Sequence, residues 1–189
     1  DNASEDGSQD LLENSYGSNI RLIQNDENFG FAKANNQGLE IAMGEFVMFL
    51  GSDTVVKPGA IMTLIHRLNE LSESYAGVSP QLLNQDGSIQ ESCRNFPSPW
   101  TLVLDFIGIW RLFPNSQFFG NYRMSYWNHD SDQDVLQPQM TALMLRKSAI
   151  DQIGSIDERF PIYFNDVDWC RRLFDNGLKI RFISSAQIY

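Results

Sequence analysis

Two short segments of this sequence carry aspartates in settings where a carboxylate can do chemistry. Asp53 follows an apolar run, in the segment GSDT at 51–54, and Asp166 follows another, in the segment FPIYFNDVDWCRRL at 160–173. A fold that aims carboxylates into a cleft needs rigid elements just before them. Because a carboxylate can bind a hard cation or accept a proton, we expect one segment to serve a metal ion and the other a proton transfer.

The element expected before Asp53 is a β-strand. Residues 46–50 (FVMFL) form a continuous apolar run of strand length, which is typical of a strand buried on both faces in a parallel sheet. Ligands of such sheets gather at the carboxyl ends of the strands, which is where Asp53 lies. By its position alone, Asp53 also fits a turn residue that merely ends the strand.

The element expected to carry Asp166 is a helix over residues 166–176, which has an apolar side and ends at Gly177. Asp166 and Asp168 are two residues apart, so on a helix they point in widely separated directions. We therefore do not assign both to one proton transfer. An acid in the first turn of a helix is also favoured by the helix dipole without any function, and Asp168 fits that interpretation better.

The remaining sequence predicts one layered α/β domain over residues 1–189, with a mostly parallel mixed sheet flanked by helices. Apolar periodicity and turn residues predict helices at 4–14 (capped by Ser4), 31–43 and 58–72, and strands at 20–24, 76–84, 139–146 and 179–184. The aromatic segment 96–119 has no clean period. We expect it to cover the core or to pack in an acceptor loop, with a membrane interface as the alternative.

Charge and composition exclude several classes of protein. With 24 acidic and 14 basic residues, the formal net charge is -10, which argues against a nucleic-acid partner because phosphate backbones need a basic surface. Cys93 and Cys170 lack metal-ligand spacing and predict two reduced, buried thiols in a cytoplasmic protein. No apolar run long enough to span a membrane and no signal peptide is visible, and both ends of the sequence suggest a fragment of a longer protein.

Five motifs, in their order and spacing, resemble the family 2 glycosyltransferases, and most of all their rhamnosyltransferase-like branch, which builds bacterial surface polysaccharides. They are DNASEDG at 1–7, NFGFAKANN at 28–36, LGSDT at 50–54, GSIDE at 154–158 and YFNDVD at 163–168. The resemblance implies a GT-A type, Rossmann-like fold. It also implies inverting transfer of a sugar from a nucleoside-diphosphate donor to a saccharide or lipid-linked saccharide, with rhamnose as the leading candidate and Mg or Mn as the cofactor.

The same resemblance assigns roles to individual residues. It implies that Asp53 binds the metal ion and the donor diphosphate, and that Asp166 is the general base. The nucleotide-sugar site is then expected at Asp1, Asn28, Gly30, Lys33, Asn36, Ser52, Asp53 and Thr141, and the acceptor site at Asn165 and Trp169. Peripheral association with the inner face of the membrane is left open.

The sequence departs from the family pattern at a few of these positions. Gly51 stands where the broader family often has the first acidic residue of a pair, Asn165 replaces a glutamate, and Thr141 replaces a glycine near the donor sugar. These departures keep a rival hypothesis open, namely a non-catalytic sugar- or nucleotide-binding relative of the same fold. A sugar nucleotidyltransferase is a second rival, although no glycine-rich basic loop supports it. We expect His129 to be solvated in a polar loop and His66 to lie at the surface.

Overall fold

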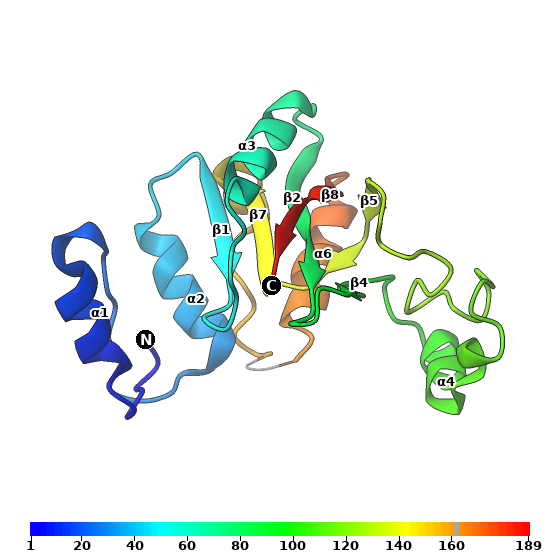
Figure 1. Cartoon of the computed structure of the whole chain (residues 1–189), viewed down its shortest axis with the longest axis horizontal. Coiled ribbons are helices and arrows are strands. Elements are labelled where there is room, and N and C mark those ends of the chain that lie inside the picture. Colours follow the sequence, from blue (N-terminus) through cyan, green and yellow to red (C-terminus); the bar gives the residue numbers. More distant parts are fainter. Residues whose placement is uncertain (161–162) are drawn as a thin grey trace.

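The computed structural model describes residues 1–160 and 163–189, so two residues of the segment that precedes Asp166 lie outside it. The fold is built on a six-stranded mixed sheet in the order β1-β7-β2-β8-β5, with β3 paired to β2 (Figure 1). In that order the strands are β1 (Phe46–Leu50), β7 (Ala142–Arg146), β2 (Tyr75–Leu83), β8 (Lys179–Ile188), β5 (Gln133–Val135) and β3 (Ile89–Gln90).

The directions of these strands confirm a mixed sheet in an α/β fold, although fewer of the strand pairs are parallel than expected. Strands β1, β2 and β8 run the same way, as expected for strands separated by helices. However, β7 runs the opposite way and lies between β1 and β2, where it pairs antiparallel with both. Strand β5 is antiparallel to β8, so β2 and β8 form the one parallel pair among the described strands. The sheet is therefore mixed, with helices on both faces.

Helices cover the two faces of the sheet unequally. One face packs against α2 (Gly30–Ile41), α5 (Lys147–Ile153) and α6 (Asn165–Asp175), and its core includes Phe49, Leu143, Trp169 and Phe182. The other face packs against α3 (Ala60–Glu70) through Leu64, Leu68 and Met144. Because adjacent residues of a strand point to opposite faces, Leu143 and Met144 of β7 contribute to different cores.

The N-terminal segment differs from its predicted structure. Helix α1 (Ser8–Tyr16) is capped at Gly7, at φ 85°, rather than at Ser4, and none of its residues is buried. The strand predicted at 20–24 does not form. This segment contacts Asp1 and not the sheet: the Asp1 amino group donates to the Ile23 carbonyl, and the Asn25 backbone amide donates to the Asp1 carbonyl.

The segment between β3 and β5 contains β4 (Cys93–Arg94), α4 (Pro99–Ile107) and a 3-10 turn (Ile109–Arg111). Strand β4 pairs with β6 (Gln137–Pro138), which follows β5, in a small two-stranded sheet. Helix α4 extends away from the main sheet (Figure 1). The expectation that the aromatic segment covers the core is wrong for most of its large side chains, because they are exposed.

Buried groups show one further correction. His129 is fully buried, where a solvated loop was expected, because its ring stacks on Trp127 at 4.0 Å and meets the edge of Phe182. Burial lowers the pKa of His129. His66 is exposed, and both cysteines are buried free thiols, as expected. Within the two described ranges, no helix combines the length and the apolar character needed to cross a bilayer.

Candidate active site

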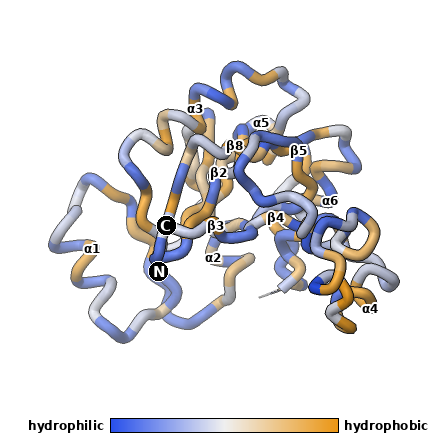
Figure 2. The backbone as a smooth tube through the Cα atoms, turned by 45° about the vertical axis from the view of Figure 1, so that its right-hand side comes forward, coloured by the Kyte–Doolittle hydropathy of each residue, from blue (hydrophilic) through white to orange (hydrophobic). Residues whose placement is uncertain are grey.

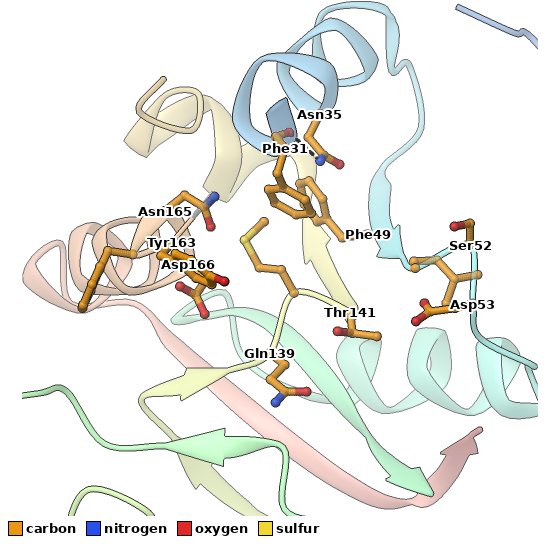
Figure 3. A pocket seen from close by; sticks show the side chains of 14 residues that line it. Phe31, Asn35, Phe49, Ser52, Asp53, Gln139, Thr141, Tyr163, Asn165 and Asp166 are labelled. Carbon is orange, nitrogen blue, oxygen red and sulfur yellow. Dashed lines mark hydrogen bonds between the residues drawn. The ribbon is translucent and has the colours of Figure 1, made fainter. Parts of the chain in front are cut away.

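A cleft of about 800 Å³ lies at the carboxyl end of β1. Four segments line it: the first turns of α2, the loop after β1, the chain that enters β7, and the start of α6 (Figure 3). The lining residues are Phe31, Asn35, Phe49, Leu50, Gly51, Ser52, Asp53, Gln139, Met140, Thr141, Tyr163, Phe164, Asn165 and Asp166. Five residues predicted from the sequence are thus brought together here: Ser52, Asp53, Thr141, Asn165 and Asp166.

The loop that carries Asp53 is held by backbone hydrogen bonds. The Gly51 amide donates to the Thr141 carbonyl at 2.8 Å, and the amide and hydroxyl of Thr54 both donate to the Gly51 carbonyl. A Cβ at position 51 would lie 2.6 Å from Oδ1 of Asp53 and 3.3 Å from Cγ2 of Thr141. The Asp53 carboxylate therefore folds back over Gly51, into space that any other residue would occupy.

Asp166 lies in the first turn of α6, which begins after Phe164 at φ 65°. One carboxylate oxygen, Oδ1, accepts from the Val167 amide at 2.9 Å, and the other, Oδ2, accepts from Nε2 of Gln137 at 3.1 Å. Gln137 is buried in β6. Two donors thus fix the orientation of the carboxylate. Figure 3 shows Asp53 and Asp166 on opposite sides of the cleft, with Thr141 and Gln139 between them.

Asp168 faces away from this cleft. Its Oδ2 accepts from Nε of Arg172 at 2.9 Å, one turn along α6. The same Arg172 donates to the carbonyls of Ile153 and Ser155. Asp168 therefore serves to position an arginine that ties α6 to the preceding loop, and the two aspartates have separate surroundings, as the helical spacing predicts.

The two residues assigned to an acceptor differ in their access to the cleft. Asn165 lines the cleft, although little of its side chain is exposed, and its Nδ2 donates to the Phe160 carbonyl. Trp169 is fully buried and cannot contact an acceptor, so that assignment is corrected. Its ring meets Phe49 edge-on at 5.2 Å, and its Nε1 donates to the Gly154 carbonyl. Trp169 thus supports the wall of the cleft from behind.

Asn36 is also corrected, because its side chain is buried and committed to the protein. Its Nδ2 donates to the Ile156 carbonyl and to Glu158, and its Oδ1 accepts from the Ile156 amide, all at 2.9 Å. These bonds fasten the GSIDE motif at 154–158 to α2. The motif therefore holds α2 and α6, which carry two walls of the cleft, in fixed relation.

The other residues predicted to bind the nucleotide gather beside the cleft without lining it. Asn2 organises them: its Nδ2 donates to Oδ1 of Asn28 and to the Gly30 carbonyl, and its Oδ1 accepts from the Phe29 amide. Asp1 accepts from the Ser4 amide and from Gln9. The ammonium group of Lys33 lies 3.5 Å from the centre of the Phe29 ring. Phe31 and Asn35, from the same helix as Lys33, are the ones that reach the cleft.

A divalent cation fits this site only if the donor supplies part of its coordination. Among residues 1–160 and 163–189, no group of three or more His, Cys, Asp or Glu side chains is placed to hold a metal ion. Asp53 offers one exposed carboxylate. Mg²⁺ is commonly held by one or two carboxylates together with substrate phosphates, and the single carboxylate here is consistent with that arrangement.

Several residues of the site were missed from the sequence. Gln137 reaches Asp166 from β6, which pairs with β4, and no local pattern indicates that pairing. The apolar walls at Phe49 and Met140 resemble ordinary core residues in the sequence, whereas Phe31 lies within the motif NFGFAKANN. Tyr163 and Phe164 had a usable signal, because they directly precede Asp166 in the motif YFNDVD.

Comparisons with known proteins agree with this geometry. The sequence profile described as "Glycosyl transferase family 2" matches residues 1–136. The chain is 27% identical over 199 residues to the N-acetylglucosaminyl-diphospho-decaprenol L-rhamnosyltransferase of Mycobacterium tuberculosis, a match that covers 100% of this chain and 64% of the relative. It is 25% identical over 194 residues to a low-salt glycan biosynthesis hexosyltransferase of Haloferax volcanii, covering 90% of this chain and 57% of the relative. The chain thus spans about 64% of the length of the mycobacterial relative.

Solved structures show the fold. The crystal structure of GalNAc-T7 with UDP, GalNAc and Mn2+ superposes with a TM-score of 0.66 at 10% identity, over 98% of this chain and 34% of that one. The S. aureus TarS structure superposes with a TM-score of 0.64 at 16% identity, over 100% of this chain and 29% of that one. The fold is therefore that of the GT-A glycosyltransferases, and the chain belongs to glycosyltransferase family 2.

Proposed function

We propose that this chain forms the transfer cleft of an inverting glycosyltransferase that moves a sugar from a nucleoside-diphosphate donor to a saccharide or a lipid-linked saccharide. The observation that carries the proposal is the position of two aspartates, far apart in sequence, on opposite sides of one cleft. Inverting transfer needs one side of the cleft to hold the departing diphosphate anion. It needs a base on the opposite side to take the proton of the incoming hydroxyl.

In this proposal Asp166 acts on the acceptor. An acceptor hydroxyl oxygen attacks the anomeric carbon of the donor sugar, the bond from that carbon to the diphosphate oxygen breaks, and the hydroxyl proton passes to Asp166. The hydrogen bonds from Gln137 and the Val167 amide aim the carboxylate before the acceptor arrives. Such pre-orientation lowers the entropic cost of the reaction.

The opposite side of the cleft holds the donor. Asp53 would hold a Mg or Mn ion shared with the diphosphate, which neutralises the negative charge that develops on the leaving group. Ser52 and Thr141 flank the same position and suit the diphosphate and the sugar. We place the nucleoside near Phe31 and Asn35, toward the cluster formed by Asp1, Asn28, Gly30 and Lys33.

The names of the relatives support the choice of substrates. The name of the mycobacterial relative gives L-rhamnosyl as the transferred group and a sugar linked to a lipid diphosphate as the acceptor. Another relative, from Myxococcus xanthus, is named for O-antigen biosynthesis. For this chain we propose a rhamnose-like sugar and a role in surface polysaccharide synthesis at the cytoplasmic side of a membrane.

Calorimetry and a transfer assay test this function with a matched set of variants. Wild type should bind a nucleoside diphosphate more tightly with Mn²⁺ than without it, and Asp53→Asn should lose that dependence. Asp166→Asn should keep the binding but lose turnover by roughly 10²-fold or more, since it can no longer accept a proton. Asp168→Asn is the control, because Asp168 faces Arg172 and not the cleft, so turnover should stay near wild type.

The outcomes separate the rival hypotheses. Absence of Mn²⁺-dependent affinity for UDP, dTDP and GDP would refute the donor site. Turnover that persists in Asp166→Asn would refute the assigned base. Donor binding without any turnover by wild type, at any acceptor concentration, would instead support the non-catalytic relative.

A further inference from the structure

The segment around α4 forms an exposed apolar surface, which we call the spur. It comprises the exposed apolar side chains of Trp100, Leu102, Val103, Phe106, Ile107, Leu112, Phe113 and Phe118. Phe106 is 92% exposed, the highest value among these aromatic side chains. Soluble proteins rarely leave so many large apolar side chains together in water, so a surface of this kind indicates a binding partner.

The exposed face of the spur belongs to a well-formed helix. Ser98 and Thr101 form a reciprocal capping box at the start of α4, and Gly108, at φ 75°, ends it. Leu104 is buried and Asp105 pairs with Arg123, so one side of the helix is fixed to the protein. The helix therefore holds its opposite side outward.

The residues on that outward side follow helical geometry. Four of these side chains lie within a single arc of the helix, because their sequence spacings of one, three and one match its period: Leu102, Val103, Phe106 and Ile107. Trp100 extends the arc at the N-terminal end. Figure 2 shows hydrophobic colour along part of α4, which lies at one end of the molecule. Trp, Phe and Leu on one face of a helix are typical of segments that lie in a membrane interface.

The charge of the spur distinguishes a lipid surface from other partners. Residues 95–127 contain one acidic residue, Asp105, and two basic ones, Arg111 and Arg123, a net charge of +1. With a total of -10, the rest of the chain carries -11. Asp105 is already paired with Arg123, and the exposed Arg111 lies beside the Trp110 ring. A bilayer with anionic headgroups thus repels the rest of this chain but attracts the spur.

We propose that the spur inserts its apolar face into the surface of a lipid bilayer and so holds the cleft at the membrane. Helix α4 extends beyond the same end of the sheet toward which β1 and β2 run, and the cleft lies at the carboxyl end of β1 (Figure 1). The inference rests on the proposed function in one respect: it gives the cleft access to an acceptor whose lipid stays in the bilayer. A second copy of the chain is a poorer occupant, because each copy brings a charge of -10.

Vesicle co-sedimentation tests the proposal with a closely matched pair of variants. Phe106 and Met43 are 92% and 94% exposed, but only Phe106 belongs to the spur. Wild type should sediment with vesicles of phosphatidylcholine and phosphatidylglycerol. Phe106→Glu should reduce the vesicle partition coefficient roughly tenfold, as expected for losing the burial of one aromatic side chain. Met43→Glu adds the same charge and should partition within about twofold of wild type.

Three further measurements make the result decisive. Brominated lipids should quench the fluorescence of wild type, and Trp100→Phe should reduce that quenching. No sedimentation of wild type, or equal partition of the two glutamate variants, would overturn the proposal. The proposal would also be overturned if sedimentation velocity showed a wild-type dimer that the Phe106→Glu substitution dissociates. Mn²⁺-dependent nucleotide binding, measured on Phe106→Glu without vesicles, should equal that of wild type, so a failure of the spur is distinguished from a failure of the proposed function.

Discussion

Replacing Asn36 by alanine should destabilise the protein without removing a contact to the nucleotide-sugar substrate. The Asn36 side chain makes three hydrogen bonds of 2.9 Å, two of them with the backbone of buried Ile156. Alanine leaves the Ile156 amide and carbonyl without these partners. A lost hydrogen bond costs about 1 kcal/mol, and a buried group left unsatisfied costs about 1–3 kcal/mol, so we expect a loss of about 2–4 kcal/mol in the free energy of unfolding.

Urea denaturation measures this loss directly, and a thermal melt should show a lower Tm by roughly 4–16 °C for a chain of this size. Asn35→Ala is the matched control. Asn35 is the next residue on the same helix, and its Nδ2 makes one exposed bond to the Phe31 carbonyl. Its free energy of unfolding should change by no more than about 0.5 kcal/mol.

The reasoning is refuted if Asn36→Ala and Asn35→Ala have the same stability. It is also refuted if Asn36→Ala keeps its stability but loses nucleotide affinity. The second result would restore the role that the sequence resemblance implies for Asn36, and would mean that the 154–158 loop is held by other contacts.

Three further predictions follow from the site and the core. Gln137→Leu should lower turnover by roughly 10–100-fold, because it removes a hydrogen bond to the charged Asp166, while the nucleotide affinity measured by calorimetry stays unchanged. An equal loss of turnover and affinity would show that Gln137 has a structural role only. Gly51→Ala should displace the Asp53 carboxylate and weaken Mn²⁺-dependent nucleotide binding about tenfold, with a small change in Tm because the side chain can move; unchanged affinity contradicts it. Burial lowers the pKa of His129 below its ordinary value of 6.5. As the pH falls, His129 is therefore protonated in the unfolded chain before it is protonated in the folded chain. The contribution of the buried, neutral His129 to stability is complete above pH 6.5 and is lost as the pH falls below it. Urea titrations of His129→Phe should show a weaker pH dependence between about pH 7 and 5, and an unchanged slope would contradict the assignment.

Local sequence patterns pointed to both aspartates of the cleft, but the choice of a binding residue over a turn residue at Asp53 came from the family motifs. The apolar run before Asp53 and the helical spacing after Asp166 are local signals, and the structure has β1 and α6 at these positions. The difference between Asp166 and Asp168 also followed from helical geometry alone. The likeness of the motifs to a known family supplied the fold, which the structural comparisons confirm.

Features that depend on distant contacts could not be predicted. Asn36 and Trp169 belong to motifs associated with the active site, yet their environments are set by Ile156, Glu158 and Gly154, which a motif does not display. His129 is surrounded by polar neighbours in the sequence, but its ring meets the edge of Phe182, more than fifty residues away. A single sequence contains no record of such pairings.

The position of β7 between β1 and β2 has a consequence for how this chain is made. Phe46 lies opposite Arg146, and Gly77 opposite Leu145, so neither early strand has β7 beside it until the ribosome has synthesised most of the sequence. Until then the nascent chain exposes the apolar edge of β2 and the side chains that β7 later covers, which is a state that chaperones bind. The 1–136 segment that carries the family profile ends before β7 begins, so expressed alone it should aggregate, although it contains Asp53 and the whole N-terminal half of the cleft.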